Sequence, residues 1–159
     1  MAFIGNLVWL ILGGWILGLA YILGTLILFP LLPLLLPMIS YVFLPFGRKP
    51  VSKKAVRAYK IENNMPVIDD ALSKPTKTIT ILGTIIWPLV FGIPLAICHL
   101  IAGIINLMMC VFLVTIPINL PHALAHFKLI PVAFNPIGVR LVPVSLATAI
   151  EDSLSKSKL

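Results

Sequence analysis

Two long stretches of this chain, Met1 to Gly47 and Ile79 to Phe127, contain no Asp, Glu, Lys or Arg. Neither stretch offers enough polar surface to form the water-facing side of a soluble domain. Each is also longer than the roughly 20 apolar residues that a helix needs to cross a bilayer. The whole chain is only 11% charged, whereas soluble domains are about a quarter charged. The sequence therefore predicts two membrane-embedded segments.

The positive charge is concentrated outside these stretches. The chain has 12 Lys and Arg against 5 Asp and Glu. Most of the cations lie between the two stretches or in the tail: Arg48, Lys49, Lys53, Lys54, Arg57, Lys60, Lys74 and Lys77, then Lys156 and Lys158. Cationic loops of membrane proteins remain in the cytoplasm, so the linker and the C-terminus are both predicted to be cytoplasmic. The first six cations are expected to contact anionic lipid headgroups rather than nucleic acid.

The two apolar stretches share a pattern of Gly, Trp and Pro. Gly5, Trp9, Gly14 and Gly18 are matched 78 positions later by Gly83, Trp87, Gly92 and Ala96. Pro30 and Pro45-Phe46-Gly47 are matched 91 positions later by Pro121 and Pro136-Ile137-Gly138. An internal repeat in a membrane protein usually indicates two similar helical units packed about a pseudo-symmetry axis.

Each unit is predicted to form a long helix, a proline break and a shorter arm. In the first unit the helix covers about residues 3–29 and the arm covers residues 31–45. In the second unit the helix runs from about Ile79 to Ile116 with kinks at Pro88 and Pro94, and the arm after Pro121 covers residues 123–134. The arms either span in a kinked form or are re-entrant. The expected fold is an all-α membrane protein of two tandem helical-hairpin repeats, with about four membrane-inserted arms, some proline-broken or re-entrant.

This organisation predicts four segments: a first membrane repeat (1–48), a basic cytoplasmic linker (49–78), a second membrane repeat (79–142) and a cytoplasmic tail (143–159). In the linker, Ser52 is predicted to cap a helix through KKAVRAYKIE that ends at Asn63-Asn64. In the tail, Ser145 is predicted to cap a short helix. Both helices are expected at the membrane interface, with solvated disorder as the alternative. If both hairpins leave and return to the cytoplasm, the two units are parallel.

The second stretch contains several short motifs, and some of them have counterparts in the first stretch. They are Trp87-Pro-Leu-Val-Phe91-Gly92, Cys98-His99-Leu-Ile-Ala-Gly103, Pro121, Phe127-Lys128 and Pro136-Ile137-Gly138, with Gly14-Trp15, Pro30 and Pro45-Phe46-Gly47-Arg48 in the first copy. These residues resemble the YccF family of small bacterial inner-membrane proteins, here as two tandem YccF-type domains. The chain departs from the family pattern at Asn119 and Ala123, where the family has glycine. The resemblance implies an integral protein of the bacterial inner membrane and assigns no chemistry.

Lys128 and His99 are the candidate functional side chains of the second stretch. Lys128 is a cation between apolar residues, which is costly in lipid unless it faces a partner, water or the headgroups. It either lines an anion-attracting vestibule or binds a lipid phosphate, or it simply extends to the nearer headgroups. His99 either relays protons or hydrogen-bonds across helices or, more commonly, bonds to a carbonyl, and a structural hydrogen bond is a role that its counterpart Tyr21 would share.

Other motifs have simpler interpretations. His122 and His126 have the i, i+4 spacing of a metal-binding pair, but no third ligand lies nearby in the sequence, so no metal or other cofactor is expected. Cys98 and Cys110 are expected to be buried thiols. Gly14 with Gly18, and Gly92 with Ala96, are small-xxx-small pairs that let helices approach closely, either within the chain or between chains.

The sequence contains no nucleophile elbow, phosphate-binding glycine loop or pair of membrane-buried carboxylates, so catalysis is not expected. The leading hypothesis is a self-associating membrane protein that forms a small pore or permeation path. The alternative is a membrane scaffold, or a subunit of a larger complex, whose basic linker binds anionic lipid or a partner protein. Proton-coupled transport through His99 is a weaker hypothesis, since neither apolar stretch contains an acid.

Overall fold

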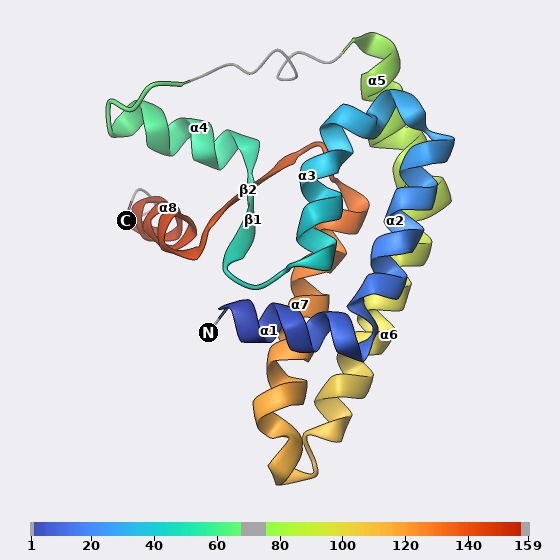
Figure 1. Ribbon diagram of the computed structural model, residues 1–159. Helices are drawn as coiled ribbons and strands as arrows, with labels where there is room; N and C mark the ends of the chain where they lie inside the picture. The colour runs from blue at the N-terminus through green and yellow to red at the C-terminus, as the bar shows by residue number, and fades with distance from the viewer. Residues whose placement is uncertain (1, 68–75, 157–159) are drawn as a thin grey trace.

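The first apolar stretch forms a bent helix followed by a shorter one. The computed structural model describes residues 2–67 and 76–156. Its first unit consists of α1 (Ala2–Trp9), the π-helical turn η1 (Leu10–Gly14), α2 (Trp15–Ile27), the 3-10 turn η2 (Phe29–Leu31) and α3 (Leu32–Phe43). The helix predicted over residues 3–29 is interrupted at Gly13, whose φ of 106° is accessible to glycine without strain. Figure 1 shows α1 turned across the direction of α2 at this point.

The second apolar stretch forms a longer hairpin. It consists of α5 (Lys77–Ile81), the π-helical turns η4 (Leu82–Ile86) and η5 (Pro88–Gly92), α6 (Ile93–Met109), the 3-10 turn η6 (Leu113–Thr115) and α7 (Ile116–Phe134). The predicted kink positions Pro88 and Pro94 fall at the start of η5 and in the first turn of α6. The π-helical turn η5 thus begins at the first of these prolines and ends two residues before the second.

The predicted break at Pro121 is wrong, because Pro121 lies inside α7. The chain reverses after Met109 instead, and the Thr115 side chain is within hydrogen-bond distance of the Met109 and Phe112 carbonyls in the turn, at 2.6 and 2.8 Å. Pro117 occupies the first turn of α7, where the N–H that proline lacks has no helical partner to lose. Pro117, and not Pro121, is therefore the proline that marks the start of the return helix. The sequence alone did not show which of the two prolines has this role.

Three helical segments are long and apolar enough to cross a membrane: Ala2–Ile27, Leu82–Met109 and Leu113–Phe134. The first of them includes the bend at Gly13. A shorter apolar segment, Phe29–Phe43, is about 22 Å long at 1.5 Å per residue, against about 30 Å for the hydrocarbon core. The all-α membrane fold is confirmed, and the arm of the first unit is too short to span as a straight helix.

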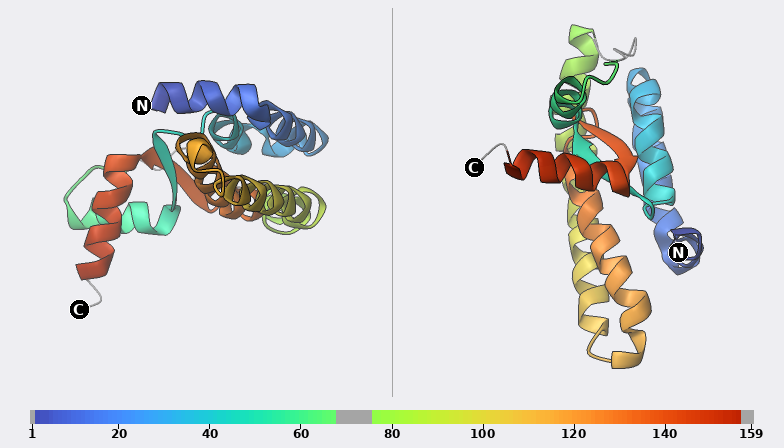
Figure 2. Two further views of the ribbon diagram at one scale, coloured as in Figure 1. Left: turned by 90° about the horizontal axis from the view of Figure 1, so that it is seen from below. Right: turned by 90° about the vertical axis from the view of Figure 1, so that its left-hand side faces the viewer.

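The strands and helices that follow α3 and α7 form a single unit, here called the polar module. Two antiparallel strands, β1 (Arg48–Ser52) and β2 (Val139–Pro143), pair along their whole length. The helices that follow them, α4 (Lys53–Glu62) and α8 (Val144–Lys156), pack together around Val56, Val142, Ala147 and Ile150. Figure 2 shows the module projecting to one side of the apolar helices. The two-stranded ribbon was not among the predicted elements.

The linker helix begins and ends where the sequence predicted. The Ser52 hydroxyl accepts a hydrogen bond from Ala55 N at 3.1 Å, and the helix ends before Asn63, with Asn64 at a φ of 52°. The predicted cap at Ser145 is wrong, because α8 begins one residue earlier, directly after β2. Lys74 and Lys158, which contributed to the predicted charge asymmetry, lie outside the described residues.

The two hairpins point in opposite directions. The turn between α2 and α3 lies at one end of the molecule and the turn between α6 and α7 at the other, in Figure 1 and in the right-hand view of Figure 2. The expected parallel arrangement is therefore wrong. The reason is the ribbon: α3 leads into β1 and α7 leads into β2, and these strands pair antiparallel.

Several contacts recur between the two units at the spacings seen in the sequence. Trp9 Nε1 donates to the Val42 carbonyl at 2.9 Å, and Trp87 Nε1 donates to the Ala133 carbonyl at 2.9 Å. At the ends of the ribbon, Lys53 N donates to the Gly138 carbonyl at 3.0 Å, and Val144 N donates to the Gly47 carbonyl at 3.4 Å. Both tryptophans are buried in the main core, between the long helices.

Candidate functional site

The three histidines of the chain lie in the α6–α7 hairpin and are buried. His99 is on α6, whereas His122 and His126 are on α7. They are 0%, 4% and 8% exposed. Buried imidazoles in an apolar hairpin require hydrogen-bond partners, because lipid and hydrocarbon side chains provide none. Their partners therefore define what this region can do.

His99 and His126 bond to each other. Their Nδ1 atoms are 3.0 Å apart, and the ring centroids are 5.3 Å apart. In such a contact one Nδ1 carries a proton and the other supplies a lone pair. The partner of His99 is thus an imidazole on the opposite helix and not a carbonyl. This pair joins α6 to α7 through a single shared proton.

His122 is held in a fixed orientation. Its Nδ1 lies 2.7 Å from the Ile118 carbonyl, which only accepts hydrogen bonds, so Nδ1 carries the proton. The ring stacks on Trp9, with centroids 5.6 Å apart and planes 26° apart. The metal-binding interpretation of the i, i+4 pair gains no support, since within residues 2–67 and 76–156 no three His, Cys, Asp or Glu side chains are arranged so that they could hold a metal ion.

Three buried polar atoms have no hydrogen-bond partner among the residues that the structure describes: Tyr21 Oη, His99 Nε2 and His122 Nε2. Each such atom costs about 1–3 kcal/mol relative to a satisfied one. Tyr21 packs against His99 with ring centroids 6.1 Å apart, so the two atoms belong to one neighbourhood. His99 thus has the expected structural hydrogen bond through Nδ1, whereas the expectation that Tyr21 shares this role is wrong, because Tyr21 Oη has no partner among the described residues.

A crevice of about 320 Å³, here called the polar crevice, lies between the bend of the first helix and the α6–α7 hairpin. Its polar side chains are Cys98, Asn106, His122 and His126. Cys98 is exposed, which corrects the expectation of a buried thiol. The bend at Gly13 forms part of the wall, so the irregularity in the first helix shapes this surface.

Lys128 lies near the polar module and is half-buried. It is close enough to Lys49 on β1 for the two charges to interact. Both cations are therefore near the junction between the apolar helices and the polar module. This position suits a side chain that extends to the headgroups. Lys128 follows His126 by only two residues but is not among the residues that line the polar crevice.

The small residues pack within the chain. A Cβ on Gly14 would meet the Trp9 ring, one on Gly18 would meet the Phe43 ring, and one on Gly92 would lie 2.8 Å from the Ala133 carbonyl oxygen. Ala96, the fourth member of this set, is also buried. These faces are thus occupied by the chain's own helices.

The predicted lipid-contacting cations have different surroundings. Arg48 donates to the Ser40 carbonyl at 3.1 Å and to the Leu44 carbonyl at 3.4 Å, so it stabilises the end of α3. Lys49 pairs with Glu151 at 3.1 Å. The remaining members of the set lie on α4: Lys53, Lys54 and Arg57 are exposed, and Lys60 is 3.4 Å from the Pro66 carbonyl.

Two asparagines in the apolar stretches were not singled out from the sequence. Asn6 forms two hydrogen bonds with Phe46, accepting from its N–H at 2.9 Å and donating to its carbonyl at 3.3 Å. Asn106 lines the polar crevice and donates to the Ala102 carbonyl at 2.8 Å. An amide in a charge-free apolar stretch is itself the signal that would have identified both.

The comparisons with known proteins concern the second stretch. Residues 82–139 match the family model for YccF, described as an inner membrane component domain. No curated protein and no solved structure matches the chain. The matched segment contains the whole α6–α7 hairpin, with its three histidines. Residues 82–139 are therefore similar to a YccF inner membrane component domain, and the three apolar helices agree with an integral membrane protein.

Proposed function

We propose that the chain is a non-enzymatic protein of the inner membrane that self-associates and provides a small permeation path. The observation that carries this proposal is the polar crevice. It gathers Cys98, Asn106, His122 and His126 in a surface that otherwise consists of apolar side chains. Channels and transporters place their few intramembrane polar groups along the route of the permeating species.

The position of the crevice favours self-association. Its rim includes Leu12, Ile16 and Ile105, which are 57%, 57% and 54% exposed. In a bilayer this rim contacts acyl chains, which cannot satisfy the polar groups behind it. A second copy seated on the rim would enclose the crevice and create a partly polar path between the two copies. The small-xxx-small pairs themselves pack within the chain, and of their four members only Gly14 also lines the crevice.

The exposed thiol of Cys98 provides a direct test of self-association. In Cys110→Ser, Cys98 is the only thiol, and a bifunctional maleimide is expected to convert much of the protein in native membranes to a covalent dimer. The matched control is Cys98→Ser, which retains only Cys110 beside the α6–α7 turn and is expected to form little dimer. A Cys98-only protein that reacts with a monofunctional maleimide but remains a monomer with the bifunctional reagent contradicts the proposal.

Permeation is tested in proteoliposomes that contain a pH-sensitive dye. We expect a proton or small-ion flux above that of protein-free vesicles, reduced at least tenfold in Asn106→Leu. The control is Ile101→Leu, on the exposed side of α6 and outside the crevice. The permeation proposal fails if the dimeric wild-type protein passes neither protons nor small ions.

The second candidate function is a membrane scaffold that binds anionic lipid or a partner protein through its linker. It is favoured by the exposed cations Lys54 and Arg57 on α4. In nanodiscs with anionic lipid, amide exchange in α4 is expected to be slower than in zwitterionic nanodiscs, and Lys54→Glu with Arg57→Glu is expected to remove the difference. Equal exchange in both lipids argues against the scaffold function.

We infer that the polar module is cytoplasmic. The linker helix and the tail helix are in contact, and Ser153 Oγ donates to Glu62 at 2.8 Å, so both lie on one side of the membrane. The excess of cations assigns that side to the cytoplasm. Accessibility tags after residue 62 and after residue 156 are expected to report the cytoplasm, and a tag exposed on the opposite face contradicts the assignment.

We also infer that the two apolar stretches are copies of one unit. The matched tryptophan bonds support this inference, as do the reciprocal bonds at the two ends of the ribbon. The ribbon pairs β1 with the strand at the equivalent place in the second unit, as a two-fold arrangement requires. The chain would then resemble a dimer of hairpins joined by its own linker.

A further inference from the structure

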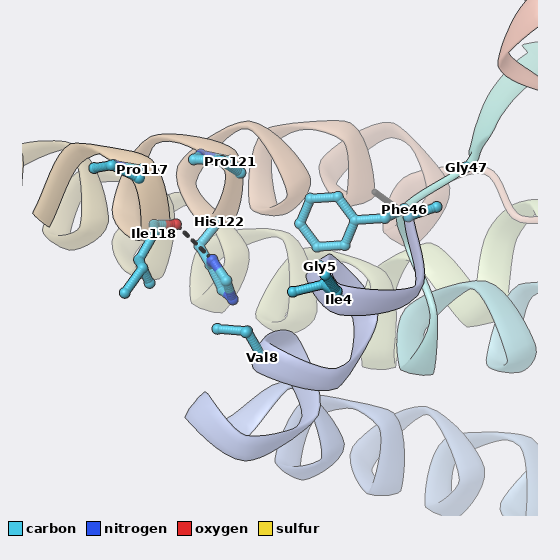
Figure 3. A pocket seen from close by; sticks show the side chains of 10 residues that line it. Ile4, Gly5, Val8, Phe46, Gly47, Pro117, Ile118, Pro121 and His122 are labelled. Carbon is cyan, nitrogen blue, oxygen red and sulfur yellow. Dashed lines mark hydrogen bonds between the residues drawn. The ribbon is translucent and has the colours of Figure 1, made fainter.

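A second cavity, of about 510 Å³, lies on the other side of His122. It is formed by α1, the turn at Phe46–Gly47 and the first half of α7. Its apolar side chains include those of Ile4, Val8 and Ile118 and the two prolines of α7, Pro117 and Pro121. Figure 3 shows the His122 ring among these side chains. The size falls within the roughly 300–1,000 Å³ typical of small-molecule sites.

His122 is the polar side chain of this cavity, and its free nitrogen lacks a partner. The residue is 4% exposed, and no group in the described part of the chain bonds to its Nε2. In Figure 3 the nitrogen remote from the Ile118 carbonyl points toward Val8, across the space between α7 and α1. Since Nδ1 carries the proton of the neutral ring, Nε2 presents a lone pair. The cavity therefore offers one hydrogen-bond acceptor in an apolar surround.

Hydrogen bonds and a ring contact hold the walls, so the acceptor has a defined position. The His122 ring is fixed by its bond to Ile118 and by stacking on Trp9, whose own Nε1 is bonded to Val42. Phe46 is held by both of its bonds to Asn6. A preorganised site loses little entropy when a ligand binds.

From this geometry we propose that the cavity binds a neutral, membrane-soluble amphiphile with an apolar body and one hydroxyl group, which donates to His122 Nε2. The lining contains no Lys or Arg, so a phosphate or carboxylate headgroup finds no counter-charge there. A plain acyl chain would fill the apolar volume but leave Nε2 without a partner. A hydroxyl donor satisfies both features of the site.

The test uses a long-chain alcohol with a diazirine in its chain as a photoreactive probe, with the purified protein in nanodiscs. Labelling is expected in the peptides that contain residues 2–8 and 116–122. Dodecanol is expected to compete about five- to tenfold better than dodecyl methyl ether, whose oxygen cannot donate, as one neutral hydrogen bond predicts. Equal competition by the two compounds, or labelling confined to other helices, overturns the proposal.

Two variants test the contributions of the acceptor and of the cavity separately. His122→Phe keeps an aromatic ring on Trp9 but has no acceptor, so the advantage of the alcohol over its ether is expected to disappear while labelling persists. Val8→Phe fills the cavity from α1 and is expected to lose labelling altogether. If His122→Phe does not fold, as judged by circular dichroism and gel filtration, the ether comparison and Val8→Phe still decide. Unchanged labelling of folded Val8→Phe contradicts the site.

Discussion

At the scale of single residues, the two buried tryptophans make the same bond from equivalent places in the chain. Trp9 donates to Val42 and Trp87 donates to Ala133, both at 2.9 Å. Each bond satisfies an indole N–H and links the first helix of a unit to its return helix. The carbonyl and the indole would otherwise be left without a partner in a region that excludes water.

We predict that Trp9→Phe and Trp87→Phe destabilise the protein by similar amounts, about 1–3 kcal/mol each. Phenylalanine keeps most of the ring but leaves the carbonyl of Val42 or Ala133 unpaired. The measurement is unfolding in mild detergent by titration with SDS, followed by circular dichroism. Trp15→Phe, at a side chain that is 48% exposed, is the control and should change little.

The histidine pair allows a double-mutant cycle. His126→Phe leaves His99 Nδ1 buried without its partner, at an expected cost of about 1–3 kcal/mol. His99→Phe combined with His126→Phe removes both polar groups, so the double variant should be more stable than the sum of the single effects predicts. Additive effects in the same SDS titration would mean that the two rings do not interact.

At the scale of the elements, the bend between α1 and α2 depends on one backbone angle. Gly13 has a φ of 106°, and a Cβ there would meet only the Ile16 side chain at 3.6 Å. Gly13→Ala should therefore cost about 1–2 kcal/mol through backbone strain rather than through a clash. Unfolding by SDS measures this cost. Leu12→Ala in the same turn is the exposed control, and equal losses in the two variants would contradict the strain argument.

The elements that sequence predicted best are those determined by local interactions. The helix over residues 53–62 followed from its own cap, since Ser52 bonds to Ala55 three residues away. The apolar arms followed from hydropathy over one window. The ribbon was missed because β1 and β2 lie far apart in the chain, without the short turn that identifies a hairpin.

The candidate site was only partly predictable for the same reason. His99 and Lys128 stood out as polar residues in apolar stretches, but the contact of His99 with His126 depends on where the hairpin turns. The predicted break at Pro121 would have placed His122 and His126 at the beginning of a short arm. The actual turn lies before Ile116, so both histidines are inside the long helix α7, which packs against α6. The turn has local features, the Thr115 bonds and Pro117 at the start of α7, but a chain with several prolines in this region does not show which of them marks the break.

At the scale of the whole molecule, the polar module joins the two hairpins through a small core and an exposed ion pair. Ile150 is fully buried in that core, whereas the Lys49–Glu151 pair is exposed. Ile150→Ala should cost about 2–5 kcal/mol, and Glu151→Gln less than about 1 kcal/mol. Amide exchange of β1 and β2 checks this, because loss of the core should expose both strands together. Equal protection in Ile150→Ala and the wild-type protein would contradict the role of this core.

The pairing of Arg48 with Pro143 also has a consequence for biosynthesis. The ribosome completes the first strand long before it makes the second, so the first hairpin enters the bilayer while its strand still has an open edge. The nascent chain thus carries a strand with an unpaired edge until the second strand has been translated, and the Lys and Pro within the first strand disfavour its pairing with other chains. Ribbon closure is a late event, and a ribosome stalled before residue 139 would hold an intermediate in which the first strand has no native partner.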